Sequence, residues 1–198
     1  MARLQLNKSA LARESAQLRT YERFLPSLDL KRQQLMATRA TARAEVARLE
    51  EQVLDLARRV GRDVPMLANE DIALDGLVQL DHAQLSRENV VGVMLPRLDG
   101  ITVRVHPYSP LAKPQWVDAV AELLRDMLEA QLRVRVGRAR LAELDKAVAT
   151  ITQRVNLFDK VLIPNTRANI KKIRVYLSDE EMQSVVRSKI SKRKRVVS

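Results

Sequence analysis

Apolar residues recur at alternating intervals of four and three residues through the second half of the chain. From Trp116 to Leu162, thirteen of the fourteen positions on this stripe are apolar, and the remaining one is Gly137. An average spacing of 3.5 residues is typical of a left-handed coiled coil, in which such positions form a buried seam. At about 1.5 Å per residue, the stripe predicts a helix roughly 70 Å long.

The N-terminal third carries a matching stripe. Steps of three and four residues from Leu11 to Val60 meet fifteen positions, of which twelve are apolar; the exceptions are Glu14, Arg32 and Arg39. Because the two stripes have similar lengths, we expect a mainly α protein in which they pair within one chain as a long antiparallel two-helix coiled coil. The N-terminal long helix would occupy residues 1–60, and the C-terminal long helix with its basic tail residues 114–198. A parallel homodimer is the alternative.

Two prolines fall inside these predicted helices. Pro26 removes a backbone donor and clashes with the preceding turn, so we expect a kink there or a helix that restarts near Ser27. Pro164 follows the second stripe, and the apolar positions resume in a shifted register at Ile170, Ile173 and Leu177. This pattern predicts a kinked but continuing helix.

The residues between the stripes, 61–113, predict a small central head. Residues 61–88 are rich in acids and turn formers and indicate short helices and turns. Runs of β-branched residues at 89–95 and 101–106 flank a loop, 96–100, that contains Asp-Gly, which predicts a β-hairpin near 89–106. Prolines at 107, 110 and 114 then predict an extended connector. The hairpin residues are Val91, Val93, Leu95, Ile101 and Val103.

Charge is distributed unevenly along the chain, whose formal net charge is +11. Residues 1–60 carry 12 basic and 7 acidic residues, and residues 151–198 carry 12 and 4. Residues 62–90, by contrast, carry 2 basic and 6 acidic residues. An antiparallel pair of helices would therefore bring both basic ends of the chain to the same tip.

The chain lacks the residue patterns of an active site. It has no cysteine, no phosphate-binding glycine loop and only two histidines, His82 and His106, which lie far apart in sequence. We therefore expect no catalytic, cofactor-binding or metal-binding residues and no enzyme activity of the chain's own. No uncharged apolar run approaches the ~20 residues that span a bilayer, so direct membrane insertion is not expected. The basic segment 188–195 is compatible with nucleic-acid phosphates, acidic lipid, an acidic protein cavity or a solvated tail.

Three segments, in the same order along the chain, resemble the D subunit of V-type (vacuolar or archaeal-type) rotary ATPases. They are residues 6–11 (LNKSAL), 88–96 (ENVVGVMLP) and 154–164 (RVNLFDKVLIP). The resemblance implies a central rotor stalk whose paired helices enter the catalytic hexamer of A and B subunits. It also implies binding to the small F subunit and to a subunit that links the stalk to the membrane ring, and a cytoplasmic location peripheral to that membrane. Pro26, Arg32 and Arg39 depart from what the resemblance leads us to expect of a straight first helix.

Torque transmission between the hexamer and the membrane ring is thus the predicted function, without nucleotide or nucleic-acid binding. Rotation inside a ring requires contacts that break and re-form, and surface charge pairs are each worth only ~0–1 kcal/mol. We expect five exposed bases to face the hexamer: Arg154, Lys160, Arg167, Lys171 and Arg174. The alternative function is that of a basic coiled-coil protein that binds nucleic acid or acts as a scaffold.

Overall fold

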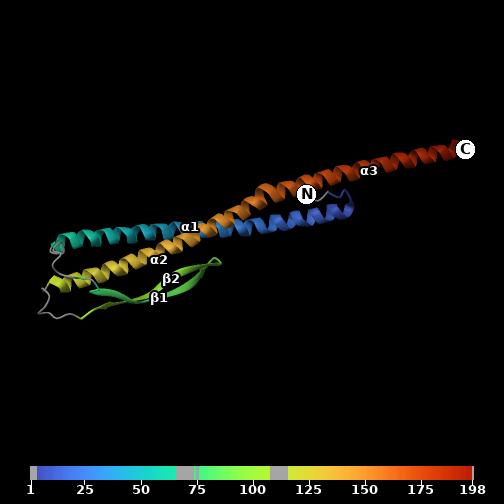
Figure 1. Ribbon diagram of the computed structural model, residues 1–198. Helices are drawn as coiled ribbons and strands as arrows, with labels where there is room; N and C mark the ends of the chain where they lie inside the picture. The colour runs from blue at the N-terminus through green and yellow to red at the C-terminus, as the bar shows by residue number, and fades with distance from the viewer. Residues whose placement is uncertain (1–3, 66–73, 75, 108–115, 198) are drawn as a thin grey trace. The chain divides into compact units, whose positions relative to one another are not determined.

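The computed structural model describes residues 4–65, 74, 76–107 and 116–197. A 56-residue helix, α1 (Lys8–Asp63), is followed by strands β1 (Val78–Val90) and β2 (Val93–Val105). Helix α2 (Trp116–Asn156) continues through a π-helical segment, η2 (Leu157–Leu162), into α3 (Ile163–Val197) (Figure 1). The predicted fold class, two long helices with a β-hairpin between them, is confirmed.

Two compact units divide the chain. The first unit comprises the chain up to Arg32 together with the chain from Thr150 onward, and the second runs from Gln33 to Ala149. The first unit therefore pairs the start of α1 with the end of α2, η2 and α3. The second pairs the rest of α1 with most of α2 and contains the hairpin.

No position of the predicted seam is exposed in either unit. All fifteen positions from Leu11 to Val60 and all fourteen from Trp116 to Leu162 are buried or half-buried. Within the second unit, the seam residues Leu35 and Leu144 are 1% and 0% exposed. Interlocked apolar side chains on the stripe therefore hold the helices together, as the spacing predicted.

Polar pairs across the seam give the direction of the two helices. In the second unit, Arg39 pairs with Asp145 at 3.6 Å and Glu50 with Arg138 at 2.6 Å. In the first unit, Glu22 pairs with Arg167 at 2.7 Å and Lys8 with Glu181 at 3.8 Å. In each unit the number of the second partner falls as that of the first rises. The helices are therefore antiparallel within one chain.

Two arginines occupy seam positions and find acidic partners. Arg39 reaches across the second unit to Asp145, whereas Arg32 turns to Asp29 on its own helix, with 2.6 Å between Nη2 and Oδ1. The Nε of Arg32 is buried without a hydrogen-bond partner. An unpaired buried donor is unfavourable, so Arg32 weakens the seam at the point where the first unit ends on α1.

Pro26 does not interrupt α1. The helix runs unbroken from Lys8 to Asp63, so a restart near Ser27 is wrong. Pro26 is exposed, and the carbonyl of Glu22 that loses its helical donor therefore lies on the solvated face. The seam residues on both sides of Pro26 hold the chain in helical conformation at the cost of one backbone hydrogen bond.

The register shift predicted near Pro164 occurs in η2. Val155 and Ile163 are both buried seam residues and are separated by eight residues, one more than the seven of a regular repeat. The π-helix accommodates the extra residue, because the backbone N–H of Ile163 donates to the carbonyl of Phe158, five residues earlier. The continuing helix is confirmed, with Ile170 and Ile173 buried and Leu177 half-buried beyond the shift.

The hairpin is longer than predicted, and its turn lies elsewhere. β1 and β2 pair antiparallel from Val78↔Val105 to Val90↔Val93, so the turn is Val91–Gly92. Both turn residues have positive φ, 53° and 78°, as a two-residue type I′ turn requires, and Asn89 Oδ1 accepts a hydrogen bond from Gly92 N at 2.8 Å. The expected loop at 96–100 is wrong, because those residues lie inside β2.

The Asp-Gly sequence forms an irregularity in β2 instead of a turn. Gln84 pairs with Gly100 and Leu85 with Leu98, which leaves Asp99 as an extra residue, as in a β-bulge. The prediction of short helices and turns is also wrong for residues 78–88, which form most of β1. The segments 66–73 and 108–115 lie outside the described residues. The second segment includes Pro110 and Pro114 of the predicted extended connector.

Gly137 of α2 lies close to α1 in the second unit. A Cβ at this position would lie 3.0 Å from Val46 Cγ2 and 3.8 Å from Leu49 Cδ1, whereas a Cβ at Gly61 on α1 would meet nothing within 4 Å. Gly137 therefore permits close packing at the seam. Gly61 makes no such contact, and its only effect is to lower the helix propensity of α1.

We expect opposite effects from filling these two positions. Gly137→Leu should lower the free energy of unfolding by about 1–3 kcal/mol through overpacking. Gly61→Ala should raise it by about 0.5–1 kcal/mol, because alanine favours a helix interior over glycine. Chemical denaturation of the purified chain measures both. A stabilised Gly137→Leu would contradict the close approach to Val46.

Candidate functional site

Three of the five predicted contact residues border one groove in the first unit. Arg167, Lys171 and Arg174 follow one another on α3 at intervals of four and three residues, which places them on one helical face. The groove has a volume of about 560 Å³, and its other lining residues are Ser15, Leu18, Arg19, Ile170 and Val175. The pattern of α3 alone missed Arg19, because only the pairing of α1 with α3 brings this fourth base to the groove.

The bases of this groove differ in their partners. Arg167 forms an ion pair with Glu22 of α1, with 2.7 Å between Nη2 and Oε1. This ion pair links α3 to α1. Lys171 and Arg174 are exposed, and within the described residues neither has an acidic partner. These two, with Arg19, are therefore the positive charges that the groove offers to another molecule.

The other two predicted contact residues lie outside this groove. Arg154 is on α2 and Lys160 is in η2; both are exposed and belong to the first unit. Neither of them is among the residues that line the groove. The structure thus gathers Arg167, Lys171 and Arg174 and leaves Arg154 as a separate exposed base.

The last part of α3 extends past the start of α1 (Figure 1). Lys8, the first residue of α1, pairs with Glu181, and every residue from Ser178 to Arg193 is exposed. One helical face of this segment carries apolar side chains at helical spacing, with exposed fractions from 49% to 65%: Met182, Val185, Val186 and Ile190. An apolar face with bases beside it lies open on this segment.

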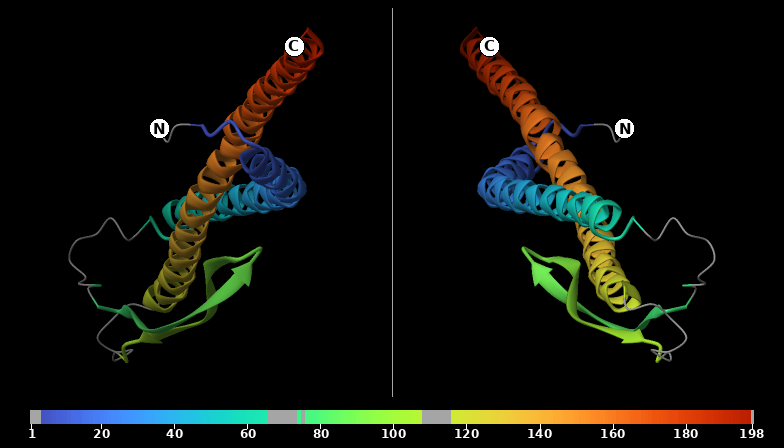
Figure 2. Two further views of the ribbon diagram at one scale, coloured as in Figure 1. Left: turned by 90° about the vertical axis from the view of Figure 1, so that its right-hand side faces the viewer. Right: turned by 90° about the vertical axis from the view of Figure 1, so that its left-hand side faces the viewer.

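The hairpin in the second unit is anchored to α2, along which it runs (Figure 1, Figure 2). Arg140 donates from Nη2 to Glu88 Oε1 at 2.6 Å and from Nη1 to the Pro96 carbonyl at 3.5 Å. Leu95 is fully buried. The other four predicted hairpin residues are half-buried: Val91 in the turn, and Val93, Ile101 and Val103 on β2.

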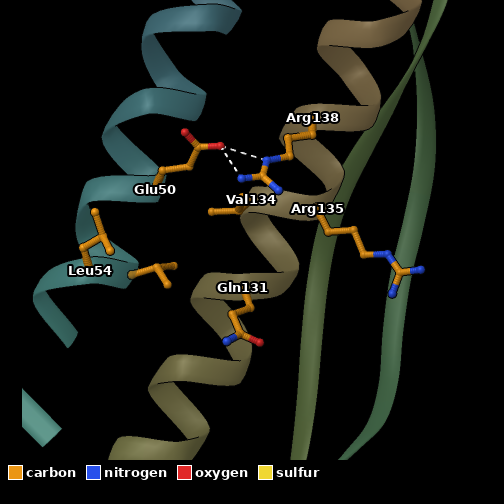
Figure 3. A pocket seen from close by; sticks show the side chains of 7 residues that line it. Glu50, Leu54, Gln131, Val134, Arg135 and Arg138 are labelled. Carbon is orange, nitrogen blue, oxygen red and sulfur yellow. Dashed lines mark hydrogen bonds and ion pairs between the residues drawn. The ribbon is translucent and has the colours of Figure 1, made fainter. Parts of the chain in front are cut away.

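A second groove lies between α1 and α2 in the second unit (Figure 3). It has a volume of about 600 Å³, and Val53, Leu54 and Val134 supply its apolar lining. The ion pair of Glu50 and Arg138 closes one end, while the Arg135 side chain points away from α1. Leu54 is 57% exposed at this groove. This apolar groove is a second candidate docking surface.

The two units differ strongly in charge. The first unit contains 19 basic and 7 acidic residues, a net charge of +12, while the second contains 16 and 17, a net charge of −1. The positive charge of the chain is therefore concentrated in the unit that carries the basic groove, as expected from pairing the basic ends. Such a surface favours an acidic or polar partner.

The described part of the chain contains neither a metal-binding cluster nor a helix suited to span a membrane. Residues 4–65, 74, 76–107 and 116–197 contain no group of three or more His, Cys, Asp or Glu side chains placed to hold a metal ion. Among the described helices, none combines the length and apolar character needed to cross a membrane.

Comparison with known proteins agrees with this arrangement. Residues 10–193 match the family of ATP synthase D subunits. The chain belongs to this family. The D subunit of the V-type ATP synthase of Borreliella burgdorferi is 30% identical over 194 residues, which cover 97% of this chain and 95% of that protein. The corresponding V-type ATP synthase D subunit of Chlamydia felis is 30% identical over 196 residues, which cover 98% and 94%.

As a member of the D-subunit family, the protein is a stalk component of a V-type ATP synthase and a non-catalytic part of that complex. The resemblance seen in three short segments of the sequence is confirmed over nearly the whole chain. The alternative of a nucleic-acid-binding or scaffold protein finds no support in these comparisons. The antiparallel helices of each unit are the structural counterpart of the stalk.

Proposed function

We propose that this stalk protein transmits torque between a hexamer of A and B subunits and a membrane-bound ring, and that its first unit is the part held by the hexamer. The net charge of +12 on that unit carries this proposal. Lys171 and Arg174, which lack acidic partners among the described residues, would meet acidic or polar groups of the hexamer. Arg154, Lys160 and Arg167 would supply further contacts, Arg167 while it also braces α1.

Stiffness and weak contacts together suit a rotating part. Two helices with interlocked seams resist bending and twisting better than a single helix. Exposed charge pairs, each worth ~0.2–1 kcal/mol, allow contacts to break and re-form as the stalk turns. The apolar face formed by Met182, Val185, Val186 and Ile190 would extend the contact within the hexamer beyond the start of α1.

Two further partners complete the proposed assembly. The small F subunit would bind the second unit, where the groove of Figure 3 exposes Leu54. Another subunit would link the stalk to the membrane ring, so the protein would be cytoplasmic and attached to the membrane through the complex.

Crossed substitutions in the two units test these assignments. Lys160→Glu, Lys171→Glu and Arg174→Glu combined should weaken binding to the A/B hexamer at least about tenfold, because each reversal replaces a weak attraction with repulsion. The loss should shrink as salt concentration rises, since exposed charges are screened. Co-purification and titration of the purified hexamer with each stalk variant measure the effect.

Leu54→Arg is the matched control, because it alters the second unit alone. It should reduce capture of the F subunit and leave hexamer binding unchanged, whereas the triple charge variant should retain the F subunit. Unchanged hexamer affinity in the charge variant would exclude the basic surface of the first unit as the hexamer contact. Loss of both partners in either variant would show that the two surfaces are not separate.

A further inference from the structure

The first unit contains three departures from regular α-helical hydrogen bonding within a short length of coil. Pro26 removes one backbone hydrogen bond from α1. In η2, backbone hydrogen bonds between residues five apart replace the four-residue bonds of an α-helix. Pro164 then follows η2 at the second position of α3. All three lie in the first unit, so they belong to one compact body.

A contact between two aromatic rings shows where these three features lie relative to one another. Tyr21 of α1 and Phe158 of η2 meet edge to face, with ring centroids 5.4 Å apart. Pro26 lies five residues after Tyr21, and Pro164 lies six residues after Phe158. Because the helices are antiparallel, the two prolines flank the ring contact on opposite sides, each within about two helical turns of it.

The same length of coil is poorly buried. η2, which the structure describes in full, has no buried residue, although Val155 before it and Ile163 after it are each 6% exposed. On α1, none of the residues between Ala10 and Leu35, all of them described, is buried. Segments with few buried apolar contacts and irregular backbone hydrogen bonding open locally at low free energy.

Thr166 adds a bend-promoting contact at the end of this segment. Its hydroxyl donates to the Leu162 carbonyl at 2.7 Å, four residues earlier, and it is the buried polar residue of this coil. Threonine hydroxyls bonded in this way often bend helices. On the α1 side, the ion pair of Glu22 with Arg167 ties the two helices together beside the ring contact.

We propose that Pro26, η2 and Pro164 form a compliant joint in the stalk, pivoting on the Tyr21–Phe158 contact, where the coil twists and bends more easily than in its regular parts. Its role as an elastic element rests on the proposed function in torque transmission. The joint would let the hexamer-held part of the stalk rotate slightly behind or ahead of the rest of the stalk during a rotation step. Meanwhile the Tyr21–Phe158 contact and the Glu22–Arg167 ion pair would keep the helices together.

Hydrogen–deuterium exchange in the assembled ATPase complex tests the joint directly. Amides of Leu157–Leu162 should exchange at least about tenfold faster than those of Leu144–Ile151 in the regular part of α2. A regularised stalk, with Val161 deleted and Pro164→Ala, should lose most of this difference, because the deletion removes the extra residue of η2. Asn165→Ala, an exposed neighbour, is the control and should exchange like the wild type.

A mechanical readout then separates the joint from the torque function. In a single-molecule rotation assay, the regularised stalk should show a narrower angular spread during each pause than the wild type. Pro26→Ala alone is the second variant, should the regularised stalk fail to assemble, and should slow exchange near Tyr21. Equal protection of η2 and α2 in the wild type, or an unchanged angular spread in a regularised stalk, would overturn the joint. A complex that shows the exchange difference but never rotates would instead count against torque transmission.

Discussion

Leu144→Pro is expected to abolish incorporation of the protein into the ATPase complex. Leu144 is a seam residue of the second unit and is 0% exposed. A proline there removes a helical hydrogen bond and clashes with the carbonyl of Arg140, at a cost of about 3 kcal/mol or more. Loss of the buried leucine side chain adds about 2–5 kcal/mol. Together these reach the roughly 5–15 kcal/mol that stabilises a typical domain.

Circular dichroism of the purified chain and its recovery with the hexamer measure this outcome. Leu144→Met, which keeps the side-chain volume, should cost less than about 1.5 kcal/mol and assemble normally. Leu144→Ala should fall between the two, since it loses the side chain and keeps the backbone bond. Normal recovery of the proline variant would mean that the α2 seam around Leu144 is not needed for assembly.

The seam was predictable because its signal is repeated many times. One apolar residue at a three- or four-residue interval says little by itself. The stripes from Leu11 to Val60 and from Trp116 to Leu162 repeat the signal many times, and every position on them is buried or half-buried. The antiparallel pairing followed from the matching lengths. The register shift was also visible, since Ile170 and Ile173 fall outside the earlier repeat, although its location in η2 required backbone bonding that no sequence pattern expresses.

The hairpin was predicted less well, because its turn uses an unusual residue pair. Val91 has a positive φ of 53°, which a β-branched side chain rarely adopts, while Asp99–Gly100 carries the usual turn signal and lies inside β2. The bulge at Asp99 and the hydrogen bond from Gly92 N to Asn89 Oδ1 both depend on the pairing of β2 with β1. The sequence of β1 shows little alternation of apolar and polar residues. Propensity alone therefore placed the turn about seven residues too late.

The surfaces were predicted only in part, for a related reason. The exposure of the five bases followed from their positions off the seam, but the groove that three of them border also depends on the partner helix. Arg19 joins Lys171 and Arg174 only because α1 and α3 are paired. The use of Arg167 in an ion pair with Glu22, 145 residues away in sequence, has no local signal.

Deleting one residue should have opposite consequences at two positions of the same continuous helix. Deletion of Ala142 in α2 should unfold the stalk, because every residue beyond it turns by about 100° relative to the seam. Ile151, Val155, Ile163, Ile170 and Ile173, each at most 7% exposed, would then leave their partners. At about 1.5–3 kcal/mol for each buried side chain, the loss is comparable with the whole stability of the fold.

Deletion of Val161 in η2 should instead leave the stalk folded. Val161 is 44% exposed, and its removal brings Ile163 to the seventh position after Val155, where a regular α-helical seam places it. We therefore expect a melting temperature equal to or above that of the wild type, measured beside the Ala142 deletion under the same conditions. If both deletions unfold the chain, η2 does more than absorb one extra residue, and the seam on α3 depends on the π-helical geometry itself.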